Sequence, residues 1–149
     1  MREILFRAKR IDNGEWAEGF YQNRFDVNED IEHLIFWRKS YTVWEYAKID
    51  SETLCQYTGL KDKNGNRIWE NSILKGFTYP FFCDGEFNYF ATVEWSEEYK
   101  YFFLYTVKNP ESTVRGISEG NSELFEDFNS DDWEVIGNIF DDPELLKGE

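Results

Sequence analysis

The sequence has few residues that bind transition metals through nitrogen or sulfur: two cysteines and one histidine among 149 residues. Cys55 and Cys83 are far apart and form no Cys-x-x-Cys pair, and His33 is the only imidazole. A zinc site would need both thiols, that imidazole and a carboxylate. The sequence therefore predicts no metal site, no cofactor and two reduced thiols without a disulfide.

Long apolar segments are also missing. No run approaches the roughly 20 apolar residues of a membrane-spanning helix, and no apolar stretch of about 7–15 residues follows the Met1-Arg2-Glu3 start. We therefore expect neither a signal peptide nor contact with a membrane. Reduced cysteines agree with a cytoplasmic location.

Basic residues are scarce: the chain has 16 Lys and Arg residues and 30 Asp and Glu residues, which gives a formal charge of −14. Affinity for nucleic acid depends mainly on Lys and Arg, so we expect no nucleic-acid partner. The only basic cluster comprises Arg2, Arg7, Lys9 and Arg10. Strand alternation would divide these side chains between two faces, which favours a solvated strand end over a phosphate contact.

Sequence motifs of common enzymes are absent. The chain has no GxxxxGK[ST], GxGxxG, GxSxG or HExxH pattern. His33 has no nucleophile at a recognisable spacing. The acidic pairs Asp131-Asp132 and Asp141-Asp142 are interpreted as solvent-exposed acids, because the side chains of adjacent strand residues point apart. Asp142-Pro143 also suits the start of a short helical turn. We expect a protein that is not an enzyme.

Aromatic residues are abundant, at 19% of the chain, and favour a β-rich fold. Alternating apolar residues predict hairpins over residues 3–21, 31–46 and 89–107 and a closing strand at Trp133–Phe140. A helix is the alternative for residues 30–37, and a short helix is predicted over 119–127. Trp37 and Trp44 are expected to face inward.

The segment from Tyr57 to Ile68 reads as strand, reversal and strand. Asn64-Gly65 predicts a type I′ turn, in which both central residues have positive φ. Asp50–Thr53 is the best domain boundary, so we predict an N-terminal β-hairpin region at 1–53 and a second domain at 54–149.

Three segments carry a family resemblance. They are Arg2–Ala8, which has a Phe-Arg-Ala core; Gln56–Gly65, which reads QYTGLKDKNG; and Trp133–Phe140 with the following Asp142–Leu146. Together they resemble the YopX family of bacteriophage and prophage proteins, which has no established biochemical activity. The resemblance implies an SH3-type β-barrel in the C-terminal part and a bacterial host cytoplasm. One departure is Asn71-Ser72, where the family usually has Gly-Asp.

The sharpest candidate binding residues are Tyr79, Phe81 and Phe82, which flank Pro80 and precede the Asp84-Gly85 turn. Proline interrupts strand pairing, so this segment would form an aromatic loop, either exposed to a partner or folded back onto the barrel. The favoured function is a non-enzymatic phage accessory protein that binds an unknown host or phage protein. Aromatic edge strands would also permit a homo-oligomer.

Three alternative functions follow from the sequence. The first is an acidic DNA mimic that inhibits a host nucleic-acid enzyme, because residues 117–149 carry 11 acidic residues and one basic residue. The second is a hydrolase or nuclease that uses clustered carboxylates and a divalent metal, and the third is a nucleic-acid-binding barrel.

Overall fold

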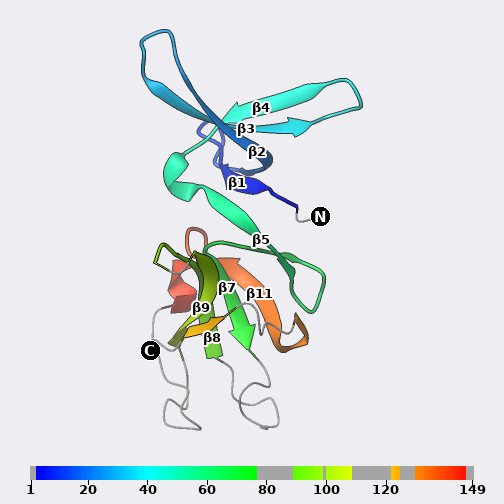
Figure 1. Cartoon of the computed structure of the whole chain (residues 1–149), viewed down its shortest axis with the longest axis vertical. Coiled ribbons are helices and arrows are strands. Elements are labelled where there is room, and N and C mark those ends of the chain that lie inside the picture. Colours follow the sequence, from blue (N-terminus) through cyan, green and yellow to red (C-terminus); the bar gives the residue numbers. More distant parts are fainter. Residues whose placement is uncertain (1–2, 77–88, 99, 109–121, 125–129, 147–149) are drawn as a thin grey trace. The chain divides into compact units, whose positions relative to one another are not determined.

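The computed structural model describes residues 3–76, 89–98, 100–108, 122–124 and 130–146 (Figure 1). The chain divides into two compact units, Met1–Gly59 and Leu60–Glu149. Both are built from antiparallel strands and short 3-10 helices, which confirms the mainly β prediction. The domain boundary predicted at residues 53 and 54 stays a prediction, because compactness does not test independent folding.

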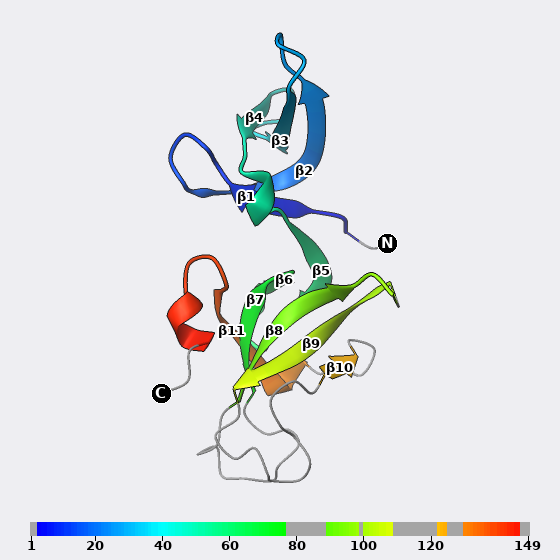
Figure 2. The same ribbon diagram turned by 90° about the vertical axis from the view of Figure 1, so that its left-hand side faces the viewer.

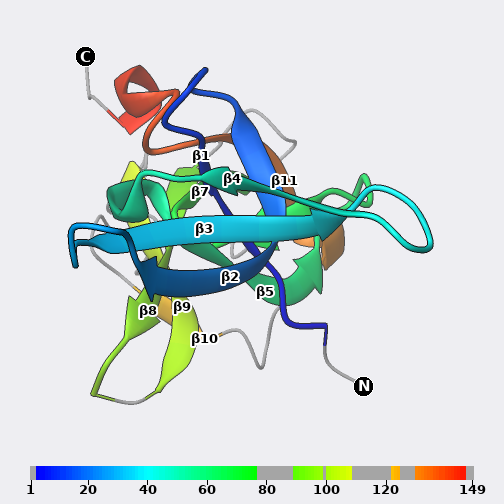
Figure 3. The ribbon, with the colours of Figure 1, turned by 90° about the horizontal axis from the view of Figure 1, so that it is seen from above.

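The first unit contains four strands of its own and the start of a fifth. They are β1 (Phe6–Lys9), β2 (Trp16–Phe25), β3 (Ile31–Arg38), β4 (Trp44–Lys48) and β5 (Cys55–Lys61), with the 3-10 helix η1 (Ser51–Thr53) before β5. The strand order is β4-β3-β2-β1-β5, and Figure 3 shows β3 between β2 and β4. The last two residues of β5, Leu60 and Lys61, belong to the second unit, which also contains β6 (Arg67–Trp69).

Both hairpins predicted for this unit are confirmed. In the first, Phe6 to Lys9 pair with Gly19 to Trp16, and the connecting turn places Gly14 at φ +73°. In the second, β3 pairs with β4, so the alternative of a helix over residues 30–37 is wrong. The β-branched and aromatic residues of Ile31–Trp37 suit a pleated surface better than a helix.

Alternation along the strands places small and aliphatic residues in the core of the first unit. Its buried cluster comprises Ala8, Ala17, Ile35 and Ile49. Phe6, Tyr21, Trp37 and Leu54 pack against this cluster. Trp37 therefore faces inward, as predicted.

The second unit contains a five-stranded antiparallel sheet in the order β10-β9-β8-β7-β11, and Figure 2 shows β7, β8 and β9 side by side. Its strands are β7 (Ser72–Gly76), β8 (Tyr89–Ser96), β9 (Tyr101–Lys108), β10 (Ser122–Leu124) and β11 (Trp133–Asn138), with 3-10 helices η4 (Ser130–Asp132) and η5 (Pro143–Leu146). The predicted hairpin at 89–107 and the closing strand are confirmed. Among the described residues the sheets are open, so the SH3-type barrel is not confirmed.

The core of the second unit is larger and more aromatic. Its buried cluster consists of Ile68, Leu74, Ala91, Val93, Phe102, Leu104 and Trp133. Leu60, Trp95 and Val135 pack against it, and the Trp95 and Phe102 rings meet edge to face at 4.9 Å between centroids. Burial of these rings accounts for part of the aromatic surplus in the sequence.

Two helical predictions have different outcomes. Pro143 does begin the 3-10 helix η5, as the Asp142-Pro143 pair predicts. The helix predicted over residues 119–127 is wrong at Ser122–Leu124, because these residues form β10 and pair with Phe103–Tyr105 of β9. Local helical spacing was outweighed there by pairing with a strand distant in sequence.

The reversal after β5 also differs from the prediction. Gly65 has φ +81°, but Asn64 does not have positive φ, so the type I′ assignment is wrong. Asp62 instead closes the loop: its N–H donates to the Asn66 carbonyl at 2.9 Å, and its carbonyl accepts from the Gly65 N–H at 3.1 Å. Because the Asp62 carboxylate caps this turn, Gly65 is the only residue of the turn that has to adopt a positive φ.

At the altered Asn71-Ser72 position, Asn71 takes φ +67° and the Ser72 hydroxyl accepts a hydrogen bond from the Trp69 N–H at 3.0 Å. Asparagine tolerates this conformation better than most residues, so the pair forms the turn between β6 and β7 without glycine. In the described part of the chain, no helix has the length and apolarity to cross a membrane.

Candidate docking face

The binding residues predicted from sequence, Tyr79, Phe81 and Phe82, lie outside the described residues, as does Cys83. Their role stays a prediction. The site described below is built from residues of the first unit.

The titratable residues that could have suggested catalysis have structural partners. The His33 ring stacks on Tyr21 at 5.9 Å between centroids, and its Nδ1 is hydrogen-bonded to the Tyr21 hydroxyl. Cys55 is buried, and its thiol donates to the Thr53 carbonyl at 3.2 Å. Within the described ranges, no group of three or more His, Cys, Asp or Glu side chains could hold a metal ion.

Asp62 is the most buried carboxylate of the described residues, at 4% exposure. Its oxygens accept from the backbone N–H groups of Asn64 at 2.9 Å, Asn66 at 2.8 Å and Val135 at 2.9 Å. Burial alone would raise the Asp62 pKa, but these hydrogen bonds to the ionised form outweigh it and lower the pKa. This carboxylate joins the turn to β11, so its role is structural.

The basic cluster near the N-terminus is divided, as alternation predicts. The guanidinium of Arg7 and the ammonium of Lys9 lie over the Trp16 ring, at 4.6 and 5.6 Å from its centroid. Arg10 instead donates to both Asp12 oxygens, at 3.0 and 2.7 Å. These bonds raise the Arg10 pKa and lower the Asp12 pKa.

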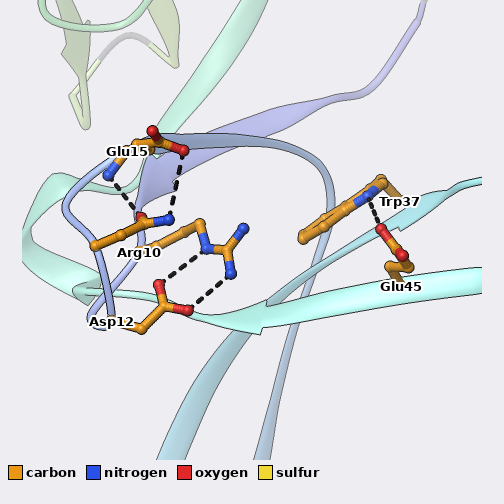
Figure 4. A network of polar contacts seen from close by, with 6 residues as sticks. Arg10, Asp12, Glu15, Trp37 and Glu45 are labelled. Atoms are coloured by element: carbon orange, nitrogen blue, oxygen red, sulfur yellow. Dashed lines mark hydrogen bonds and ion pairs between the residues drawn. The ribbon is translucent and has the colours of Figure 1, made fainter.

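Figure 4 shows this Arg10–Asp12 pair beside the Trp37 indole, whose Nε1 donates to Glu45 at 3.1 Å. The Arg10 guanidinium lies 5.9 Å from the Trp37 ring centroid. Every charged group in this network already has a protein partner, so it is a poor candidate for binding a ligand.

The opposite side of β3 carries the strongest candidate. Because side chains alternate along a strand, Phe36 lies on the face opposite to Trp37, together with its register partners Phe20 on β2 and Tyr46 on β4. Trp44, two residues before Tyr46, lies on the same side. We call Phe20, Phe36, Trp44 and Tyr46 the aromatic face.

Three of these four rings are about half exposed: Phe20 at 53%, Trp44 at 48% and Tyr46 at 52%. Phe20 contacts Trp44 at 5.9 Å and Phe36 contacts Tyr46 at 5.4 Å between ring centroids. The rings therefore form one connected surface across three strands. The expectation that Trp44 faces inward is wrong.

Arginine side chains lie on two of the exposed rings. The Arg38 guanidinium is 4.8 Å from the Trp44 centroid, and that of Arg24 is 5.3 Å from the Tyr46 centroid. Such contacts favour these orientations of the two partners and contribute about 0.5–1 kcal/mol at exposed sites. The aromatic face is therefore partly preorganised.

An ion network borders the aromatic face. Glu32 accepts from Arg24 at 3.0 Å and from Lys48 at 2.7 Å. The hydrogen bond from Lys48, and after it the one from Arg24, lower the pKa of Glu32. The same hydrogen bonds raise the pKa values of Lys48 and Arg24. Leu34, next to Glu32 on the same face of β3, is fully buried.

Sequence reasoning missed this face although the signal was present. The second hairpin has aromatic residues on both sides of β3, and the core cluster of the first unit takes up the side that carries Ile35 and Trp37. Counting the aromatic residues on each face, instead of treating them as one apolar pattern, would have predicted a surplus on the surface.

The described strands define a mainly β protein built from two open antiparallel sheets, one of which exposes aromatic and arginine side chains. The YopX protein family model matches residues 5–147, and the chain belongs to this family.

Two solved structures share the fold. Protein EF1440 from Enterococcus faecalis is 22% identical, with 99% of this chain and 100% of that chain covered and a TM-score of 0.51. Protein yopX from Bacillus subtilis is 18% identical, with 97% of each chain covered and a TM-score of 0.50. No curated protein matches the chain. At these identities the similarity establishes the fold alone.

Proposed function

We propose that this chain is a phage or prophage accessory protein that acts in the bacterial host as a non-enzymatic protein-binding module, and that it docks its partner through the aromatic face. The observation that carries the proposal is the connected surface of half-exposed Phe20, Trp44 and Tyr46 rings, with Arg24 and Arg38 stacked on it. Tryptophan, tyrosine and arginine are the residues most enriched in the energetic centres of protein interfaces.

A protein partner suits this face better than a nucleic acid. Single-stranded nucleic acids stack their bases on free aromatic faces, whereas here arginines already lie over Trp44 and Tyr46. The net charge of −14 also opposes phosphate binding. A protein partner can use the guanidinium and the ring edges together.

The test compares capture of bacterial lysate proteins by the wild type, Trp44→Ala and Tyr41→Ala. Tyr41 is the matched control, because it is an exposed aromatic residue, at 89%, in the β3–β4 connection rather than on the aromatic face. We expect quantitative mass spectrometry to find proteins enriched by the wild type and Tyr41→Ala and lost with Trp44→Ala. Equal capture by all three proteins would contradict the proposal.

The acidic DNA mimic is the second candidate, and its support is the unequal distribution of charge. The second unit, residues 60–149, carries 19 acidic and 8 basic residues, whereas the first carries 11 acidic and 8 basic residues. Mimicry would use the second unit and leave the aromatic face unused. Inhibition of a DNA-binding host enzyme that persists in Trp44→Ala would favour it.

A further inference from the structure

We infer that the partner segment received by the aromatic face is an extended, acidic peptide segment with alternating apolar side chains, which adds as a strand beside β4. This inference rests on the proposed function and specifies the chemistry of the partner. It draws on the charge around the face and on the position of β4 in the sheet.

Three cations, Arg24, Arg38 and Lys48, lie on the same side of the sheet as the aromatic rings. Among the described residues, Glu32 is the only carboxylate that forms an ion pair with any of them. Arg38 is exposed and, among the described residues, its guanidinium contacts the Tyr41 carbonyl at 3.3 Å and the Trp44 ring but no carboxylate. An incoming carboxylate would therefore find an incompletely neutralised cation at this end of the face.

The arrangement also opposes docking of a second copy face to face. A twofold axis close to Arg38 would bring the Arg38 side chains of the two copies together, and Glu32, the carboxylate that pairs with the cations of this face among the described residues, already binds two bases. Like charges placed opposite one another disfavour such an interface. A partner that supplies carboxylates avoids this repulsion.

The strand β4 offers a backbone edge next to the rings. It is the terminal strand in the sheet order, and among the described residues its outer edge is occupied at one end, where the Lys48 carbonyl accepts from the Ile11 N–H at 3.0 Å. An added strand would pair with the part from Trp44 to Ala47. Every second side chain of that strand would lie beside Trp44 and Tyr46, which is the usual mode of recognition by strand addition.

The probe is a labelled synthetic peptide of about ten residues, a normal strand length, that alternates glutamate with leucine or phenylalanine. The matched peptide carries glutamine at every glutamate position. We expect the glutamate peptide to bind roughly tenfold more tightly at low salt, because carboxylates add charge-assisted contacts to the Arg38 end. Added salt should reduce this difference.

Three variants show which residues are responsible for binding each peptide. Arg38→Gln should weaken the glutamate peptide and leave the glutamine peptide unchanged, Trp44→Ala should weaken both peptides, and Tyr41→Ala should weaken neither. Since Arg38, Trp44 and Tyr41 are all exposed, each variant is expected to fold, which circular dichroism checks.

Each other outcome overturns this inference. If both peptides bind equally and Trp44→Ala weakens both, docking at the aromatic face survives but the acidic partner does not. If neither peptide binds while lysate capture still depends on Trp44, the occupant has another chemistry. Tighter binding of single-stranded oligo(dT), or a dimer in sedimentation that disappears in Trp44→Ala, would replace the peptide with a nucleic acid or a second copy.

Discussion

Replacing Asp62 by asparagine tests the structural role assigned to the turn that follows β5. In the native loop, one carboxylate oxygen accepts from the Asn64 and Asn66 N–H groups and the other from the Val135 N–H and the Asn66 amide. An amide has one acceptor oxygen and one donor nitrogen. Either orientation of the new side chain therefore turns a donor toward N–H groups that need an acceptor.

The expected loss follows from the number of broken bonds. A hydrogen bond to a charged group contributes about 1.5–3 kcal/mol, and a buried donor left without a partner costs about 1–3 kcal/mol. We expect Asp62→Asn to lower the free energy of unfolding by about 2–4 kcal/mol and Tm by roughly 5–15 °C. Urea titration followed by near-ultraviolet circular dichroism would measure the change through the buried Trp69 and Trp133.

The pH dependence has a defined sign. The folded-state pKa of Asp62 lies below its ordinary value of 3.8, so its stabilisation is complete above that value and is lost as pH falls through the folded pKa. The difference between wild type and Asp62→Asn should therefore be constant near neutral pH and shrink below about pH 3.8.

Asp12→Asn is the matched control, because Asp12 begins the Asp-Asn-Gly turn of the first hairpin but is exposed. It should change the unfolding midpoint little, since exposed ion pairs contribute little to stability. Equal stability of Asp62→Asn and the wild type would refute the reasoning.

Three further substitutions test other parts of the structure. Gly19→Ala should destabilise the first unit by at least about 2 kcal/mol in urea unfolding, because a Cβ would lie 2.0 Å from the Phe36 carbonyl oxygen; wild-type stability would contradict this close approach. Gly137→Ala should cost about 1–2 kcal/mol in the same assay, since its Cβ would lie 2.3 Å from the Asp142 carboxylate, and a neutral result would mean that this loop moves freely. Arg38→Lys should keep the protein soluble but reduce binding of the glutamate peptide severalfold in fluorescence anisotropy, because a lysine keeps the charge without the planar guanidinium; unchanged affinity would exclude a role for stacking.

The hairpins could be predicted from sequence because their information is local. Alternation in the first 21 residues and turn residues such as Gly14 determine both strands and the reversal between them. The same local reasoning failed at Asn64, because it considered the Asn-Gly pair alone and not the Asp62 carboxylate, which accepts from the Asn64 and Asn66 N–H groups and closes a different turn. It also failed at Ser122–Leu124, since β10 is defined by its pairing with β9.

The candidate docking face was missed because alternation reports which residues share a face but not which face is covered. Trp37 and Trp44 belong to one apolar hairpin, yet Trp37 packs on the core and Trp44 lies in solvent. Which side the core occupies depends on the pairing of β1 with β2 and of β2 with β3. Sequence spacing within the hairpin shows that one face has more aromatic residues, but it does not show which face the core covers.

An exposed aromatic surface next to an edge strand is a risk as well as a binding opportunity. Edge strands with flat apolar faces pair with other chains, and natural proteins limit this by placing cations there. The positive charges of Arg38, Lys39 and Lys48 are sufficient to protect the edge from pairing with other chains. Such protection depends on charge and not on how the side chains are oriented. The contacts of Arg38 with Trp44 and of Arg24 with Tyr46 also favour particular side-chain orientations, which protection does not require. Guanidinium groups held partly in place over half-exposed rings lose less entropy on docking, and this is the physical reason to interpret the surface as a binding site.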